Sequence, residues 1–137
     1  MSTSTNSANA DVVLDFFGHL SQGDAEAALA LLDDDVRYWV AGKPEQFPLA
    51  GTYNKDEFIR MLGGVGQNMP NGVQVTVTSV TAQDERVVVE ADTHGVSATG
   101  KTYDNNLIYA VEVRNGKIVK AREYLDTIHA NDVLTGN

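Results

Sequence analysis

The sequence contains no cysteine among its 137 residues. Disulfide bonds, thiolate catalysis and zinc sites with cysteine ligands are therefore excluded. Basic residues are also scarce, with 10 Lys and Arg against 19 Asp and Glu, which gives a net charge of −9 at pH 7. Nucleic acids and anionic membranes bind clustered basic residues, so we expect neither as a partner. The charge favours a small neutral or apolar ligand, although the simpler interpretation of such a charge is solubility.

Long hydrophobic runs are absent as well. No apolar segment approaches the roughly 20 residues that cross a membrane, and hydrophobic residues make up 42% of the chain. The opening MSTSTNSAN is polar and lacks the apolar segment of a secretory signal. We therefore expect a cytoplasmic protein with a disordered tail over residues 1–9, a single domain over residues 10–128 and a C-terminal tail over residues 129–137.

The first half of the sequence predicts three helices and one short strand. Each helix follows a residue suited to capping, namely Asn9, Asp24 and Asn54. Gly and Pro residues follow the first and third helices and end them. In order, the predicted elements are a helix over 10–22, a short second helix closed by the acidic run 33–35, a strand over 36–40, a loop over 41–51 and a third helix that ends at the MPNG segment, 69–72.

The second half predicts four long strands. They are VQVTVTSVTA (73–82), RVVVEADTHGVSA (86–98), KTYDNNLIYAVEV (101–113) and IVKAREYLDT (118–127). Asn115-Gly116 between the last two is a strong signal for a type I′ hairpin turn. Helices followed by strands indicate an α+β fold. We predict a cone-shaped, curved antiparallel sheet with the three N-terminal helices on its concave side, where small-molecule pockets form.

The segment VVVEADTHG, residues 87–95, combines an apolar strand pattern with three ionisable groups. Glu90, Asp92 and His94 occupy every second position, and alternate side chains of a strand share one face. If that face is exposed to solvent, the three residues need no further explanation. If it lines a pocket, they supply acid–base chemistry.

Three further segments carry a resemblance to a known family. The order of elements, together with VRYWVAG…LAGTYNKDEF, TGKTYDNN and NGKIVKAREYLDT, resembles the nuclear transport factor 2-like, or SnoaL-like, superfamily. That superfamily includes ketosteroid isomerases, polyketide cyclases and limonene epoxide hydrolases. The resemblance covers roughly Asn9 to Thr127. It implies the cone fold and a pocket for a small molecule.

The resemblance to the epoxide hydrolases also implies site residues. Their Asp–Arg–Asp arrangement corresponds here to Asp92, Glu123 and, in the place of the Arg, Glu90. It implies Asp92 and Glu123 as the catalytic carboxyl pair, of which one would keep its proton near neutral pH, with His94 as a shuttle or orienting group. In the alternative without catalysis, the two carboxyls only form hydrogen bonds with neighbouring tyrosines or with the backbone. A metal site formed by Glu90, Asp92, His94 and Glu123 is the weaker alternative, so we predict no metal and no cofactor.

The same resemblance implies which side chains face the cone. With the three catalytic candidates, the expected pocket residues are Tyr38, Trp39, Glu90, Asn105, Leu107, Tyr109, Phe16, Leu20, Phe58, Leu62 and Leu125. The opposite face would then carry Val87, Val89 and Ala91, which need a cover. Members of this superfamily often dimerise through the outer side of the sheet, so we expect a homodimer.

Three function classes follow from these expectations. The first is a cofactor-independent acid–base enzyme that isomerises, cyclises, dehydrates or opens an epoxide in a small, mostly apolar molecule. The second is a protein that binds a hydrophobic small molecule without turnover. The third is an association module whose dimer face is the function. An abnormal titration of the pocket carboxyls would distinguish the first class from the other two.

Overall fold

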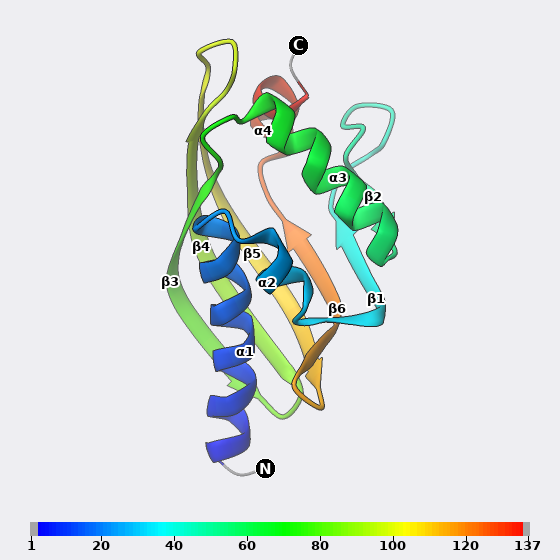
Figure 1. Cartoon of the computed structure of the whole chain (residues 1–137), viewed down its shortest axis with the longest axis vertical. Coiled ribbons are helices and arrows are strands. Elements are labelled where there is room, and N and C mark those ends of the chain that lie inside the picture. Colours follow the sequence, from blue (N-terminus) through cyan, green and yellow to red (C-terminus); the bar gives the residue numbers. More distant parts are fainter. Residues whose placement is uncertain (1–2, 136–137) are drawn as a thin grey trace.

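The computed structural model describes residues 3–135, which form four helices and six strands (Figure 1). None of the helices in this range is long and apolar enough to cross a membrane. In chain order, the elements are α1 (Thr3–Ser21), α2 (Ala25–Leu29), β1 (Leu32–Val40), β2 (Gly51–Tyr53), α3 (Lys55–Asn68), β3 (Gln74–Gln83), β4 (Arg86–Val96), β5 (Thr102–Arg114), β6 (Lys117–Tyr124) and α4 (Thr127–Leu134).

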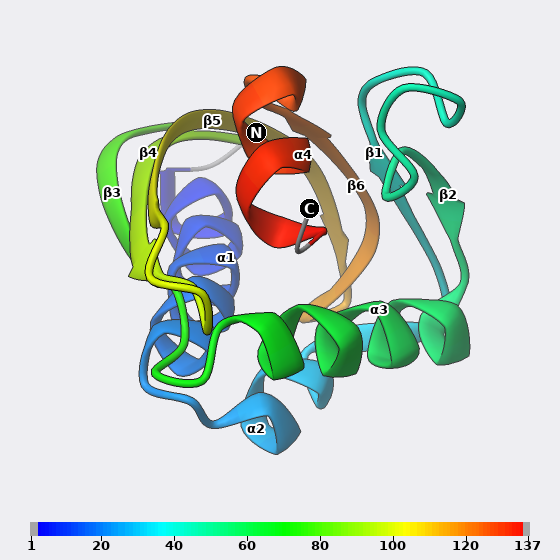
Figure 2. The same ribbon diagram turned by 90° about the horizontal axis from the view of Figure 1, so that it is seen from above.

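The six strands form one sheet in the order β2-β1-β6-β5-β4-β3. The pairing is antiparallel throughout except between β1 and β6, which run parallel. Figure 2 shows the sheet curving around α1 and α4, with α3 lying across the open side of the curve. The predicted α+β fold with a curved sheet and helices on its concave side is therefore confirmed, with β2 and α4 as additional elements.

Local sequence signals explain several of the element boundaries. The side chain of Asn54 accepts a hydrogen bond from the Glu57 backbone amide while the Glu57 side chain accepts one from the Asn54 amide, which is a complete capping box at the start of α3. Asn115 and Gly116 adopt positive φ angles of 54° and 76°. These are the values that the predicted hairpin turn between β5 and β6 requires.

Both ends of the chain are more ordered than predicted. Helix α1 begins at Thr3, so residues 3–9 are helical and not a tail. The side chains of Asn6 and Asn9 bond the Asp84 amide and carbonyl, which ties the start of α1 to the turn between β3 and β4. Residues 127–134 form α4, where a tail was expected from 129. The first two and last two residues of the predicted tails lie outside the described range.

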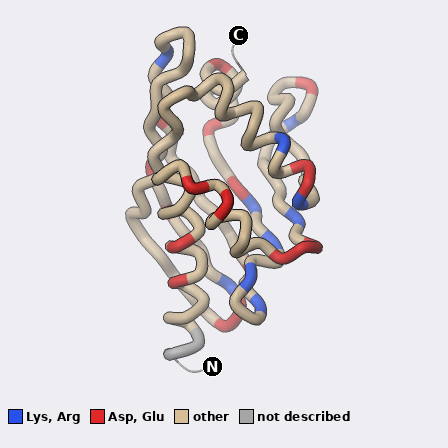
Figure 3. The backbone as a smooth tube through the Cα atoms, viewed as in Figure 1, with Lys and Arg blue, Asp and Glu red and all other residues tan. Residues whose placement is uncertain are grey.

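The acidic run 33–35 was expected to close the second helix, but α2 ends at Leu29 and the run lies within β1. Figure 3 shows these acids gathered where α2 leads into β1. The pairing of β1 with β6 shifts in register between Leu32 and Arg37. Asp34 and Asp35 are exposed and Asp33 is half-buried, so water can solvate these carboxylates.

Strand β4 turns its apolar residues inward, opposite to the prediction. Val87 and Val89 have no exposed surface, and Ala91 is 2% exposed. Burial of β-branched side chains is favourable, whereas burial of unpaired charges is costly, so the apolar face determines which way the strand faces. The three ionisable residues therefore lie exposed on the outer face: Glu90, Asp92 and His94.

Candidate active site around Glu123

A cavity of about 130 Å³ lies between the inner face of the sheet and helices α1 and α3. Apolar side chains form most of its wall. Among the described residues that line it, five carry polar side-chain atoms: Tyr38, Thr93, Tyr103, Tyr109 and Glu123. Glu123 is the single carboxyl in this set, and no Lys, Arg or His belongs to it.

The Glu123 carboxyl is surrounded by protein and has no cationic partner in the cavity wall. The residue as a whole is half-buried and lines the cavity. Burial raises the pKa of Glu123 to about 7, and a hydrogen bond from Tyr38 partly opposes this shift. Desolvation disfavours the charged form of an acid, whereas a donor to the carboxylate favours it. Glu123 can therefore either hold or accept a proton near neutral pH.

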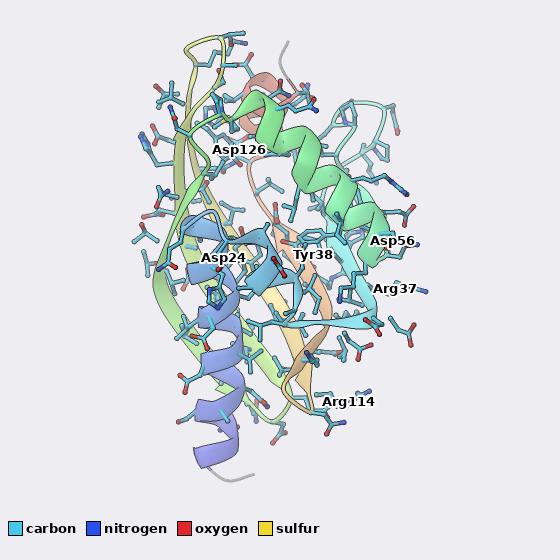
Figure 4. The ribbon with its side chains drawn as sticks, viewed as in Figure 1. Asp24, Arg37, Tyr38, Asp56, Arg114 and Asp126 are labelled. Atoms are coloured by element: carbon cyan, nitrogen blue, oxygen red, sulfur yellow. The ribbon has the colours of Figure 1, made fainter. Side chains whose placement is uncertain are left out.

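Tyr38 fixes one oxygen of this carboxyl. Its hydroxyl donates to Glu123 Oε1 over 2.6 Å, and its ring stacks on Phe58 of α3 with the centroids 4.3 Å apart. In Figure 4, Tyr38 lies beneath α3 in the interior, whereas the neighbouring Arg37 lies towards the outside. Burial, followed by the nearby Glu123 charge, raises the pKa of Tyr38 well above its ordinary value, so Tyr38 remains a neutral donor.

Tyr109 lies directly opposite Glu123 across the β5–β6 pairing. Its ring packs on Phe17 of α1 with the centroids 4.3 Å apart. Burial raises the pKa of Tyr109 well above its ordinary value, and the Glu123 charge raises it further. Tyr109, like Tyr38, therefore keeps its proton at neutral pH.

Asn105 holds α4 against the sheet. Its Nδ2 donates to the Tyr103 hydroxyl and to the Asp126 carbonyl, each over 3.1 Å. Its Oδ1 accepts from the Asp126 amide over 3.2 Å, and Asp126 in turn caps α4 by accepting from the His129 amide. We expected Asn105 to face the pocket. Since protein partners occupy its amide and it does not line the cavity, that prediction is wrong, and its role is to position Tyr103 and α4.

The structure brings most of the predicted pocket residues to the cavity and leaves out the others. The lining includes Tyr38, Leu20, Phe58, Leu62, Leu107, Tyr109, Leu125 and Glu123. Phe16 is 1% exposed but belongs to the core beside the cavity. Trp39 lies on the outer face, where its ring contacts Tyr124 and the Arg122 guanidinium lies 4.0 Å from the ring centroid.

The predicted partners of Glu123 also lie on the outer face. Asp92 Oδ1 accepts from Asn106 Nδ2 over 2.6 Å, and His94 Nδ1 lies 2.6 Å from Asp104 Oδ1. The side chains of His94 and Asp104 are 60% and 68% exposed. The sheet therefore separates Asp92 and His94 from Glu123, and the expected carboxyl pair does not form.

The alternative metal site of Glu90, Asp92, His94 and Glu123 is not assembled either. Glu123 faces the cavity and the other three face the outside. Within residues 3–135, no three His, Asp or Glu side chains come close enough to hold a metal ion.

Sequence reasoning missed two polar residues of the cavity wall, Thr93 and Tyr103. Tyr103 shares the alternation of Asn105 and Tyr109 on β5, so parity alone would have found it. Thr93 pairs with Asn105 in the β4–β5 register. It was missed because the assumed face of β4 was reversed.

Several solved structures share the fold of this chain. Bal32a from a soil-derived mobile gene cassette has a TM-score of 0.83 and 19% identity, over 95% of this chain and 98% of Bal32a. A putative SnoaL-like polyketide cyclase from Jannaschia sp. CCS1 has a TM-score of 0.79 and 15% identity, over 100% of this chain and 98% of that one. AclR, a putative hydroxylase from Streptomyces galilaeus, has a TM-score of 0.74 and 13% identity, over 88% of this chain and 90% of AclR.

These identities support a shared fold and no particular reaction. No curated protein matches the sequence. The SnoaL-like domain family matches residues 13–121, which span most of the chain and end two positions before Glu123. By this match, the chain belongs to the SnoaL-like domain family, within the nuclear transport factor 2-like superfamily.

Proposed function

We propose that the protein is a cofactor-independent acid–base enzyme that acts on a small, mostly apolar, neutral molecule. Glu123 is the proton-transfer residue in this proposal. The observation that carries it is the burial of this carboxyl in an apolar cavity, which raises its pKa to about 7. A general acid or base is most effective when its pKa lies near the working pH, and perturbed carboxyls concentrate in functional sites.

The surroundings of Glu123 limit which ligands and which reactions suit the site. The described lining residues include no cation, so an anionic ligand would meet no opposite charge, and a neutral ligand is favoured. Tyr38 occupies Oε1, which leaves Oε2 for a ligand. A single carboxyl can accept a proton from one atom and return it to another, so isomerisation or cyclisation suits the site better than a mechanism with two carboxyls.

The structural relatives give general support to this proposal. One carries the name putative polyketide cyclase and another putative hydroxylase, and both names belong to proteins that process small molecules. A passive binding protein is the second candidate. It is favoured by the small number of ionisable groups in the cavity wall, since Glu123 and three tyrosines are the titratable residues among the described lining.

A carbon-detected NMR titration of the side-chain carboxyls tests the proposal. We expect Glu123 to titrate near pH 7 in the wild type, and its signal to disappear in Glu123→Gln. Asp92→Asn is the matched control, because Asp92 lies on the opposite face of the sheet and its removal should leave the Glu123 titration unchanged. A Glu123 pKa between about 4 and 5, as in an exposed carboxyl, would reject the enzyme proposal.

A turnover assay distinguishes the passive binding protein from the enzyme. A ligand that wild type and Glu123→Gln both retain unchanged indicates binding alone. A ligand that wild type converts and Glu123→Gln only binds indicates catalysis by Glu123.

We also propose that two copies associate through the outer face of the sheet. Ile108 and Tyr124 are 43% and 42% exposed there, which leaves apolar surface open to solvent. Acidic residues lie on β4 and basic residues on β6, so a two-fold arrangement would bring opposite charges together: Glu90 and Asp92 against Lys120 and Arg122. Light scattering at micromolar concentration checks this proposal, and the mass of a single chain would contradict it.

A further inference from the structure

The hydroxyl of Tyr109 makes no hydrogen bond within the described residues. The ring itself is buried, with 4% of the residue exposed. Yet in residues 6–135, whose side chains are described, no buried side-chain nitrogen or oxygen lacks a partner. The Tyr109 hydroxyl must therefore retain accessible surface, and the space that it can reach is the cavity that Tyr109 lines.

The other tyrosines differ in this respect. Tyr38 donates to Glu123, and Tyr53 donates to the Leu49 carbonyl over 2.6 Å. Tyr103 accepts from Asn105, and Tyr124 accepts from Arg122. Tyr109 is thus the tyrosine of the described cavity wall whose hydroxyl neither donates to nor accepts from another described residue, and an oxygen atom of a ligand in the cavity can accept its hydrogen bond.

The fold fixes the position of the Tyr109 ring. Phe17 packs against the ring, and the register places Tyr109 beside Glu123 on the same face of two neighbouring strands. Side chains opposite each other in an antiparallel pair have Cβ atoms about 5 Å apart. Tyr38 already holds Glu123 Oε1. One ligand can therefore contact the Tyr109 hydroxyl and the free oxygen of Glu123 together.

We propose that Tyr109 is a specificity-determining residue that donates a hydrogen bond to an oxygen of the ligand. The ligand class is then a neutral, monocyclic compound with one carbonyl oxygen on an otherwise apolar ring. The cavity of about 130 Å³ is close to the engineered cavity of roughly 150 Å³ that accommodates benzene. This inference rests on the proposed function, because it assigns the ligand of the same cavity.

A matched pair of probes tests the inference. Cyclohexanone and methylenecyclohexane have nearly the same shape, but only the ketone accepts a hydrogen bond. The quantity to measure by titration calorimetry is the ratio of the two affinities, in the wild type and in Tyr109→Phe. We expect the affinity for the ketone divided by the affinity for the alkene to be about tenfold lower in Tyr109→Phe than in the wild type. This is the effect of losing one buried hydrogen bond.

Tyr53→Phe is the matched control, since it removes a hydroxyl that bonds a backbone carbonyl and does not line the cavity. It should leave the ratio unchanged. A ratio that is the same in wild type and Tyr109→Phe overturns the inference, and so does a failure of both probes to bind the wild type.

A second measurement covers the case in which Tyr109→Phe does not fold. The carbonyl carbon-13 resonance of labelled cyclohexanone moves downfield when its oxygen accepts a hydrogen bond. We expect a downfield shift for the wild-type complex relative to the ketone in cyclohexane, and no shift overturns the inference. The Glu123 titration is read separately. A normal Glu123 pKa rejects the proposed function, whereas a pKa near 7 with an unchanged affinity ratio rejects the role of Tyr109 alone.

Discussion

The two faces of the sheet differ in the ionisable residues that they carry. On β4 the inner face carries Val87, Val89 and Ala91, all buried, and the outer face carries the ionisable residues, all exposed. The inner face nevertheless has one carboxyl at the cavity, that of Glu123 on β6. Water solvates the carboxyls of the outer face. A charged carboxyl at the inner cavity lowers the stability of the fold, so such a group is either neutral or a candidate for a functional role. The side of the sheet, more than the number of acids, therefore distinguishes the candidate catalytic group.

The largest effect is expected from placing a second acid on the inner face. Val89 is fully buried opposite Tyr109. Val89→Asp should reduce the free energy of unfolding by about 3 kcal/mol or more, because the substitution buries a carboxyl in the hydrophobic core. The neighbouring Glu90→Gln changes an exposed residue and should alter stability by no more than about 0.5 kcal/mol. Urea denaturation of both variants checks the assignment of faces, which equal effects would contradict.

The next effect concerns how stability depends on pH through Glu123. Its folded-state pKa of about 7 lies above the unfolded value of roughly 4.3, so the folded state binds more protons between these values. Stability from this group is fully present below about pH 4 and is lost as the pH rises through 7, by up to roughly 4 kcal/mol. Glu123→Gln removes this dependence.

The measurement is the free energy of unfolding of wild type and Glu123→Gln, from about pH 4 to about pH 8. The difference between the two proteins should change in favour of the variant as the pH rises. Taking the difference cancels the contributions of the outer-face carboxyls, which both proteins share. A difference that stays constant with pH would mean that the Glu123 carboxyl is solvated like the acids of the outer face.

A smaller effect is expected from removing the Tyr38 hydroxyl. That hydroxyl stabilises the charged form of Glu123, so Tyr38→Phe should raise the pKa of Glu123 further, on the order of one unit. The same carboxyl titration measures it, with Tyr53→Phe as the control. A lowered or unchanged pKa would show that the hydrogen bond does not control the protonation of Glu123.

The fold was predictable because local signals and packing agree. The capping residue Asn54 and the Asn115-Gly116 turn specify α3 and the last hairpin by short-range chemistry. The C-terminal helix α4 was missed although Asp126 caps it, because the helix is short and its packing depends on distant partners. Asn105 bonds the Asp126 backbone, and the His129 ring stacks on Tyr103; neither contact has a sequence signal.

The candidate site was predicted in part, and the error has a physical origin. Glu123, Tyr38 and Tyr109 were placed in the pocket, and they line it. Asp92 and His94 were placed there by the resemblance to the epoxide hydrolases, against the preference of the β-branched residues of the same strand for the interior. In a strand of alternating character, the burial of apolar side chains determines the face. A one-residue difference in alignment reverses the position of every side chain.

The smallest effect is expected on the outer face, from His94→Ala. The pair of His94 and Asp104 is largely exposed, and exposed ion pairs contribute about 0–1 kcal/mol. His94→Ala should therefore change the free energy of unfolding by less than about 1 kcal/mol and leave the titration of Glu123 unaltered. The two readouts separate the faces, because a residue that acted on the cavity would move the Glu123 pKa even if stability stayed the same. A shift in that pKa would mean that charged groups on the outer face interact electrostatically with Glu123 through the sheet. Glu123 could then no longer be treated as isolated from the outer acids.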